Sequence, residues 1–384
     1  MIICTEDDKN FHLYQDKIKN RKVIFTIKQI FIDWWQKFLN KYPNITIRDI
    51  VHSSVEKLIT CKTLATGFTL YFCSMCTTKL FVCHTCKSRF CSSCGNKYNE
   101  QRGISIFSKL FRAKHRHVVF TIPEDLRIFF REDRSRLKLL FKASELTIKF
   151  WFKNKHKNLT PAFISVLHTY GRDLNFNPHI HMILLDGGIS NNDFVKINFF
   201  SYASLRKSFM KVILDLLDKE LGKTNFRKIK NNMYFTYKDG FYVYAPPSKF
   251  KDVTGLLKYV CRYLARAVMA ESRIIDYDGT FVTFWYQRHD DEKIVIEKIH
   301  AINFIERLII HIPDKHFKYI RYYGGYHNST IINIDIVKLV SKEILSWKKS
   351  LLRWRDMLII SFKKDPLKCD NCNNDMVYFD TVFT

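Results

Sequence analysis

The sequence lacks the features that would place the protein across a membrane or outside the cell. No stretch of its 384 residues approaches the roughly 20 consecutive apolar residues of a bilayer span. The first fifteen residues contain acids and no apolar segment, so we expect no secretory signal peptide. Since 47% of the residues are hydrophobic, the chain can bury a sizeable core. We therefore predict a soluble, cytoplasmic protein of two or three domains.

Acidic residues are also scarce. Lys and Arg number 63 against 37 Asp and Glu, and this formal net charge of +26 is spread along the whole chain. Genomic base composition can explain an abundance of Lys, Asn, Ile and Phe, but it does not explain why acids are so few. A polyanionic partner is the natural explanation, and nucleic acid is the commonest such partner.

The chain shows no internal repeat and no low-complexity linker. Apolar spacing predicts helices over residues 22–42, 46–59, 124–155, 203–222 and 254–270, and a long amphipathic segment over 335–362. β-prone runs predict strands over 116–123, 163–168, 179–185 and 280–286, and a hairpin over 234–244 around Asp239-Gly240. Helices and strands mix without a regular alternation, which predicts an α+β fold.

Most of the eleven cysteines form C-x-x-C pairs, which lie in the first hundred residues and near the C-terminus. Fourteen residues separate Cys73-x-x-Cys76 from Cys91-x-x-Cys94, a spacing typical of zinc ribbons and fingers. In an intracellular chain such pairs favour zinc over disulfides. The candidate ligands are Cys61, Cys73, Cys76, Cys83, His84, Cys86, Cys91 and Cys94. Either two ions bind, or one site is closed and the remaining thiols are structural.

Zinc at such a cluster is expected to be structural, because four protein ligands leave no open position for water or substrate. The surrounding basic residues favour a module that contacts DNA, and a purely architectural knuckle is the alternative; these residues are Lys87, Arg89, Lys97 and Arg102. Cys369-x-x-Cys372 forms a third pair without an obvious partner pair. This pair either binds zinc together with ligands from elsewhere in the chain, binds zinc weakly, or binds no metal.

A second candidate metal site lies on two predicted strands. His179 and His181 flank a single apolar residue, so a strand of period two places both imidazoles on one face. The polar connection from Tyr170 to Pro178 can fold the preceding strand back antiparallel, which would bring His168 across from the pair. Two histidines on one strand face make half of a metal site. The alternative is that these are ordinary core or surface histidines.

Tyr259 and Tyr263 are four residues apart, so on a helix both phenols project from one face. Lys258, Arg262 and Arg266 form a neighbouring basic stripe. A phenol beside cations has its deprotonated form favoured, and a phosphate would bind near it. The alternative is an amphipathic helix with tyrosines at its rim. The combination with a histidine metal site favours cleavage of single-stranded DNA by a tyrosine nucleophile.

The chain resembles the two-tyrosine HUH transposases of rolling-circle insertion sequences, the group numbered ninety-one, from about residue 45 to 375. The family's zinc-binding start is matched by Cys61-Lys62-Thr63, Gly67-Phe68, Cys73-x-x-Cys76, His84-x-Cys86 and Arg89-Phe90-Cys91-x-x-Cys94. Its catalytic region is matched by residues 116–123, Leu167-His168-Thr169, Pro178-His179-Ile180-His181, Tyr259-x-x-x-Tyr263 with Arg266, and Ile320-Arg321-Tyr322-Tyr323-Gly324. The chain departs from the family at Asn177, where a histidine is frequent, and Cys83 is an additional cysteine.

This resemblance implies an HUH-type fold, with a central antiparallel sheet, the histidines on a middle strand, flanking helices, and an N-terminal helical zinc-binding module. The implied domains are 1–104 for the helical and zinc-binding part, 105–330 for the catalytic part, and 331–384 for a C-terminal helix and knuckle. The implied cofactors are one or two structural Zn²⁺ ions and a catalytic Mg²⁺ or Mn²⁺ held by His168, His179 and His181.

The implied activity is a transposase that nicks single-stranded DNA at transposon ends, becomes joined to the 5′ phosphate through Tyr259 or Tyr263, and transfers the strand to a target. Arg262 and Arg266 belong to the same catalytic helix. A plasmid relaxase or replication initiator shares this chemistry, but the zinc-binding start and the Arg-Tyr-Tyr-Gly run favour the transposase. A zinc-stabilised DNA-binding regulator without activity is the alternative of another class, and the presence of all four His and Tyr side chains argues against it.

Overall fold

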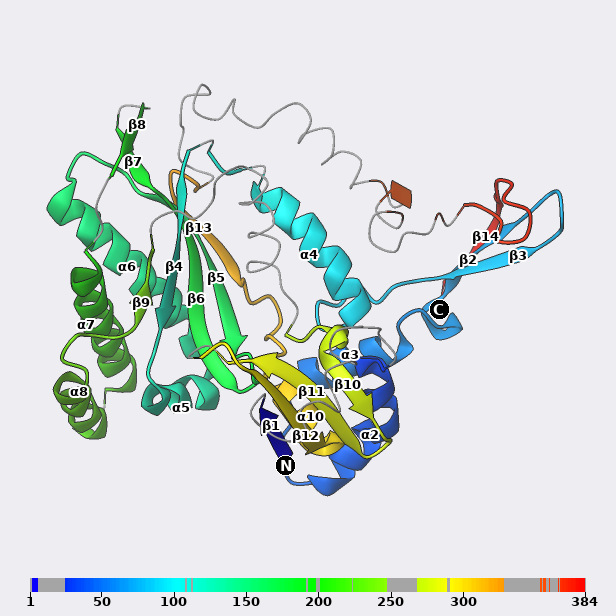
Figure 1. Ribbon diagram of the computed structural model, residues 1–384, viewed down its shortest axis with the longest axis horizontal. Coiled ribbons are helices and arrows are strands. Elements are labelled where there is room, and N and C mark those ends of the chain that lie inside the picture. The colour runs from blue at the N-terminus through cyan, green and yellow to red at the C-terminus, as the bar shows by residue number, and fades with distance from the viewer. Residues whose placement is uncertain are drawn as a thin grey trace.

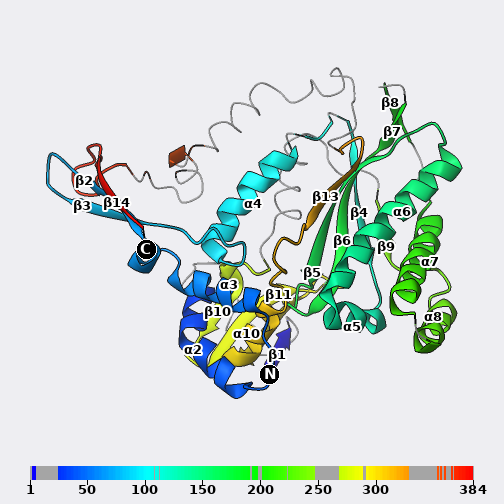
Figure 2. The same cartoon turned by 180° about the vertical axis from the view of Figure 1, so that it is seen from behind.

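The computed structural model describes most of the chain. The described residues are 2–5, 25–107, 109–111, 113–190, 193–197, 201–222, 224–246, 268–288, 291–327, 353, 355–356, 359, 365 and 367–383. Helices flank antiparallel sheets (Figures 1 and 2), which confirms the predicted α+β class. Within these ranges no helix is both long and apolar enough to cross a membrane.

A five-stranded antiparallel sheet forms the centre of the molecule. Its strand order is β13 (Ile320–Gly324), β5 (Ala162–Tyr170), β6 (Phe176–Leu185), β4 (His115–Thr121) and β9 (Val243–Tyr244). Every neighbouring pair is antiparallel. The predicted histidine strands therefore pair as expected, and the His-x-His strand β6 occupies the middle of the sheet.

The two faces of this sheet pack against different helices. Alternate residues such as Leu167 and Ile180 point into the main core, which is covered by α5 (Glu124–Glu132), α6 (Leu137–Lys155), α7 (Tyr202–Leu221) and α8 (Thr224–Thr236). Val166 and Ile183 point to the opposite face, where Ile106 of α4 (Ser92–Phe107) packs. Figure 1 shows α6, α7 and α8 on one side of the sheet and α4 on the other. The period-two alternation of β5 and β6 thus fixes which residues share the histidine face.

The helix predicted over 124–155 is two helices. Asp133 interrupts it, since its side chain accepts a hydrogen bond from the backbone N–H of Ser135 at 2.9 Å and begins a short 3-10 turn, Arg134–Arg136. The helix predicted over 203–222 is confirmed as α7, and it ends at Gly222, which adopts the left-handed conformation at φ 55°.

The hairpin predicted over 234–244 is wrong. Residues up to Thr236 belong to α8, and β9 pairs with β4 rather than with a strand before Gly240. The aromatic residues of this segment have strand propensity, but Phe226 and Met233 sit two turns apart on a helix and are both buried in the main core. Burial of this helical face outweighs the local preference of the aromatic side chains.

A second unit combines the N-terminal helices with residues far along the chain. The sheet has the order β1 (Ile2–Thr5), β12 (Ile294–His300), β11 (Phe281–Gln287) and β10 (Ile274–Tyr277), the last preceded by a 3-10 turn over Glu271–Arg273. Its helices are α2 (Ile27–Lys41), α3 (Asp49–Thr60) and α10 (Ala301–Ile309). Phe31, Phe284 and Phe304 share one core. Domain boundaries at residues 104 and 330 stay a prediction.

A three-stranded ribbon projects from the body of the molecule (Figure 1). Strand β14 (Val377–Val382) pairs with β2 (Phe68–Phe72), which in turn pairs with β3 (Lys79–Cys83). A 3-10 turn, Leu64–Thr66, precedes the ribbon. A separate small hairpin follows β6 in the chain and consists of β7 (Gly187–Ser190) and β8 (Asp193–Lys196). The ribbon brings strand β14, near the C-terminus, onto the N-terminal cysteine-rich region.

Candidate metal centres

Three histidines converge on one face of the central sheet. His168 on β5 lies directly opposite His179 on β6, and His181 follows two residues later on the same face. One ring nitrogen from each of the three lies within 4.8 Å of the others. The Nε2 atoms of His179 and His181 are 3.0 Å apart. The structure therefore brings together the three residues expected to hold a metal ion.

The outer ring nitrogens of the His-x-His pair are held by hydrogen bonds. Nδ1 of His179 lies 2.7 Å from the carbonyl oxygen of Asn177, which can only accept. Nδ1 of His181 lies 2.9 Å from Nε2 of His117 on β4. If both Nδ1 atoms carry the proton, both Nε2 lone pairs face the same point. Such bonds orient metal-binding imidazoles and fix their tautomer.

His117 is a site residue that the sequence alone did not identify. It lies two residues before Val119, which faces His181 in the β4–β6 register, so His117 and His181 are diagonal neighbours on one sheet face. Its alternation with Val118 is visible in the sequence, but only the strand register places it beside His181.

Burial keeps these imidazoles neutral. It lowers the pKa of His179 to about 4 and that of His117 to about 3. The pKa of His181 falls well below its usual value, because of burial first and the neighbouring His168 second. Metal binding requires neutral imidazole. His179 and His181 are therefore in the metal-binding protonation state at neutral pH.

One arginine acts on the histidine group through its charge. Arg127 on α5 lowers the pKa of His179 through its charge, after burial, which is the largest cause. Its Nε is buried and has no hydrogen-bond partner among the described residues. A guanidinium beside a metal site is suited to binding a phosphate.

The turn that connects the two histidine strands is fixed by the second unit. His311 contacts Thr169 through Nδ1 at 3.1 Å and the carbonyl oxygen of Leu174 through Nε2 at 2.9 Å. Arg307 donates to the carbonyl oxygen of Asp173 at 3.2 Å. Arg172 donates to the carbonyl oxygen of Gln287 at 3.2 Å. The second unit thus holds the end of the sheet on which the histidines lie.

The predicted tyrosine helix lies outside the described residues. Tyr259, Arg262, Tyr263 and Arg266 all fall between residues 247 and 267, and their placement relative to the histidines stays a prediction.

Eight of the nine cysteines whose side chains the structure describes form two groups of four. The first comprises Cys61, Cys86, Cys91 and Cys94. The Cys94 sulfur lies 3.5 Å from that of Cys61 and 3.6 Å from that of Cys86. A tetrahedral zinc with bonds of about 2.3 Å has sulfur atoms about 3.8 Å apart, so this group fits a zinc ion. Hydrogen bonds from Cys86 and Cys91 hold the pKa of Cys94 far below its usual value, which favours the thiolate that zinc binds.

This first group is continuous with the core of the second unit, since Cys61, Cys91 and Cys94 are buried in it. Lys28 of α2 donates to the carbonyl oxygen of Cys61 at 2.8 Å. Glu271 accepts from Ser92 Oγ at 2.8 Å and from the backbone N–H of Ile27 at 3.0 Å. A zinc ion here would join the end of α3 to the start of α4, and these hydrogen bonds connect that site to α2 and to the η3 turn, Glu271–Arg273.

The second group comprises Cys73, Cys76, Cys369 and Cys372. It joins the turn between β2 and β3 to the pair that precedes β14, so the third C-x-x-C pair has a partner. His84 lies in neither group: its Nε2 is 3.3 Å from Thr69 Oγ1, and its ring packs 5.4 Å from that of Phe383. Cys83 also lies outside both groups.

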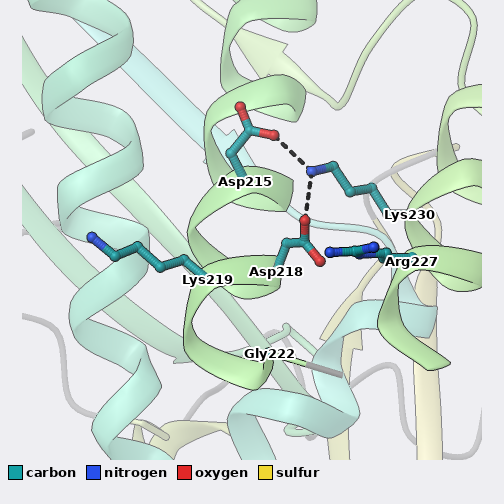
Figure 3. Close-up of a pocket in the computed structure, with 6 residues that line it drawn as sticks. All are labelled: Asp215, Asp218, Lys219, Gly222, Arg227 and Lys230. Carbon is teal, nitrogen blue, oxygen red and sulfur yellow. Dashed lines mark hydrogen bonds and ion pairs between the residues drawn. The ribbon is translucent and has the colours of Figure 1, made fainter. Parts of the chain in front are cut away.

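A surface hollow of about 440 Å³ between α7 and α8 is separate from these centres (Figure 3). Lys230 of α8 forms ion pairs with Asp215 at 2.8 Å and Asp218 at 3.1 Å on α7. Since these ion pairs join two outer helices, we assign this hollow to helix packing.

Comparison with known proteins gives two family matches and two curated relatives. Residues 30–122 match the family described as "Transposase zinc-binding domain", and residues 162–331 match the family described as "Putative transposase". The chain is 27% identical over 350 residues to the transposase for insertion sequence element IS801 of Pseudomonas savastanoi pv. phaseolicola, covering 86% of this chain and 84% of the relative. It is 28% identical over 285 residues to a protein of Sinorhizobium fredii named "Putative transposase y4qJ", covering 69% and 71%. No solved structure matches.

Proposed function

This chain belongs to the transposases of the insertion-sequence group numbered ninety-one, and from that premise we propose that it nicks single-stranded DNA by tyrosine attack. The observation that carries the proposal is the histidine group on β6 and β5, whose nitrogens lie within 4.8 Å of one another. Zinc in this protein is structural, since cysteine groups of four lie in and beside the matched zinc-binding region.

In the proposed reaction, the phenolate oxygen of Tyr259 or Tyr263 forms a bond to phosphorus in line with the bond that breaks. The 3′-oxygen leaves and takes up a proton, and the 5′ phosphate stays on the tyrosine. An ion held by His168, His179 and His181 would polarise the phosphate and neutralise its developing charge. Arg262 and Arg266 would hold the phosphate near the nucleophile. Two nucleophiles allow two covalent strands to coexist during transfer to a target.

The ligand set favours one of the two expected metals. Mg²⁺ prefers oxygen ligands and keeps several waters, whereas a site of three imidazoles suits a transition metal. The two hydrogen-bonded imidazoles, His179 and His181, are neutral and oriented. We therefore propose Mn²⁺ as the better activator and Mg²⁺ as the weaker one.

Two further residues have proposed roles beside this group. His117 is a positioning residue, since it contacts the outer nitrogen of His181 and not the metal face. Arg127 on α5 would contact the scissile phosphate, since its charge acts on His179 and its buried Nε has no hydrogen-bond partner among the described residues. The first assignment rests on a contact and the second on charge.

The proposal is tested by incubating the protein with Mn²⁺ and labelled single-stranded DNA that carries the end of the element, followed by a denaturing gel. We expect an adduct that resists SDS. His179→Ala with His181→Ala should remove the adduct and change single-strand binding only a few-fold, because phosphate contacts of Lys and Arg supply most of the affinity. His316→Asn, at an exposed histidine outside the site, is the matched control. Full adduct formation by the double variant would contradict the proposal.

A further inference from the structure

The C-terminal pair Cys369 and Cys372 lies outside both family matches, which end at residues 122 and 331. The structure places it against Cys73 and Cys76, far away in the sequence. We propose that these four cysteines bind a second zinc ion, which clasps the last strand of the chain to the N-terminal ribbon. This inference is independent of the proposed nuclease chemistry.

The distances between the sulfur atoms fit this ion. The Cys73 and Cys372 sulfurs are 3.4 Å apart, and the Cys76 sulfur lies 3.5 Å from those of both Cys369 and Cys372. These values are close to the edge of about 3.8 Å in a tetrahedron of thiolates around zinc. They are much longer than the bond of about 2 Å in a disulfide. The group is thus arranged for a shared ligand rather than for two cystines.

The two pairs have the same backbone structure. In the first, the N–H of Cys73 donates to the carbonyl oxygen of Thr78, and that of Thr77 donates to the carbonyl oxygen of Cys73, each at 2.9 Å. In the second, the N–H of Cys369 donates to the carbonyl oxygen of Asn374, and that of Asn373 donates to the carbonyl oxygen of Cys369, again each at 2.9 Å. The residue after each second cysteine is left-handed, with φ 56° at both Thr77 and Asn373. Two matching knuckles face each other across the sulfur atoms.

Polar contacts support the same arrangement. Asn371 Nδ2 donates to Thr78 Oγ1 at 2.9 Å, and this hydroxyl lies 3.1 Å from the Cys76 sulfur, so one knuckle is bonded to the other.

The apolar core at this place is too small to hold the ribbon without a further link. Its buried members are Cys73, Cys369 and Met376, two of which are ligands of the proposed ion. Most side chains of β14 are exposed, including Tyr378 and Phe379. Three strands with so little buried surface need an additional cross-link, such as a disulfide or a bound metal, to be stable. Zinc binding would supply the missing stability, since binding energy at such sites is folding energy.

The clasp would connect two parts of the molecule through the end of the chain. Strand β13 pairs with β5 in the sheet that carries His168, and β14 pairs with β2 in the zinc-binding region. The chain after β13 is therefore anchored at its far end by the second zinc. Losing this ion should release β14 and leave the histidine sheet intact.

Zinc content measured on the purified protein and on cysteine variants tests the clasp. We expect two zinc ions per chain, and one in each of Cys369→Ser/Cys372→Ser and Cys73→Ser/Cys76→Ser. The variant with all four substitutions should also keep one, because both pairs share a single ion. Cys83→Ser, the matched control outside both groups, should keep two. Two ions in the C-terminal double variant, or none in the fourfold variant, would overturn the proposal.

Thiol labelling of the unsubstituted chain gives a second test that does not depend on how variants fold. In the zinc-loaded protein, Cys369 and Cys372 should resist alkylation. As chelator is added, they should become reactive together with Cys73 and Cys76, at one chelator concentration. Cys83 should react throughout. Labelling of Cys369 in the loaded protein, or exposure of the two pairs at different chelator concentrations, would contradict a shared ion.

Discussion

Nε2 of His117 on β4 lies 2.9 Å from Nδ1 of His181 on β6, on the face of the central sheet that carries the three clustered histidines. The two rings are nearly parallel, at 11°, with centroids 5.2 Å apart. This contact leaves the Nε2 atom of His181 to face that of His179. The orientation of His181, one of the proposed metal ligands, thus depends on a neighbouring strand.

His117→Phe should weaken binding of Mn²⁺. Phenylalanine keeps the ring but cannot accept the His181 hydrogen bond, and losing such an outer partner typically lowers metal affinity about 10- to 100-fold. We expect adduct formation to need correspondingly more Mn²⁺ and to recover at saturation. The measurement is the Mn²⁺ dependence of the adduct yield. His117→Gln, whose side-chain amide oxygen can accept the bond, should recover part of the affinity. An unchanged Mn²⁺ requirement in His117→Phe would remove the positioning role.

Arg127→Met should reduce the rate of adduct formation at saturating Mn²⁺, because the proposed contact between the guanidinium and the phosphate would be lost. Loss of a charged hydrogen-bonding partner costs about 1.5–3 kcal/mol, roughly a 10- to 150-fold change in rate. Arg127→Lys keeps the charge, so its rate of adduct formation should lie between those of the unsubstituted protein and Arg127→Met. Arg131→Met, on the exposed side of the same helix, is the control. Equal rates for Arg127→Met and this control would exclude the phosphate contact.

Acidification should destabilise the protein through buried histidines outside the metal site. Burial lowers the pKa of His115 and of His311 to about 4 in the folded chain, against 6.5 for the ordinary group. Between these values the unfolded chain binds more protons, so the stabilisation is complete above pH 6.5 and is lost as the pH falls toward 4. Each group contributes on the order of 3 kcal/mol.

This pH dependence is checked by thermal unfolding at pH 7.5 and pH 5. His311→Gln can still contact Thr169 and Leu174 but does not titrate, so its midpoint should fall less than that of the unsubstituted chain. Zinc loss at low pH affects both proteins equally. The idea fails if the two midpoints fall by the same amount.

Removal of zinc from the first group should unfold the second unit. Cys61, Cys91 and Cys94 are buried in its core together with Phe31 and Phe284. We expect Cys91→Ser/Cys94→Ser to lose helical signal and protease resistance over α2, α3 and α4. Limited proteolysis with mass spectrometry locates the cleavage sites. Proteolysis confined to the ribbon residues 68–83 would show that this cluster does not stabilise the unit.

Local patterns predicted most of the elements that carry the site. The period-two runs of β5 and β6 and the short polar turn between them were enough to place His168 opposite His179. The place of His117 needs the register of β4 on β6, which no local pattern encodes. The hairpin prediction over 234–244 was wrong because burial of Phe226 and Met233 decided for a helix.

Contacts between residues far apart in the sequence could not be predicted either, because no local pattern encodes them. Cys76 and Cys369 are 293 residues apart, and neither knuckle carries a signal that identifies the other. The packing of α2 against α10 likewise joins segments that are separated in the sequence by four of the five strands of the central sheet. Each of these contacts depends on the tertiary fold, whereas the C-x-x-C and His-x-His motifs report only their own local chemistry.

The nucleophile is the central claim, and locating the covalent bond tests it most directly. The adduct formed with single-stranded DNA and Mn²⁺ is digested with protease and nuclease, and the modified peptide is sequenced by mass spectrometry. We predict a phosphotyrosine linkage at Tyr259 or Tyr263, absent from Tyr259→Phe/Tyr263→Phe, which should still bind DNA. Each single variant should keep the adduct but fail to complete transposition. A nucleotide found on any other residue would contradict the account.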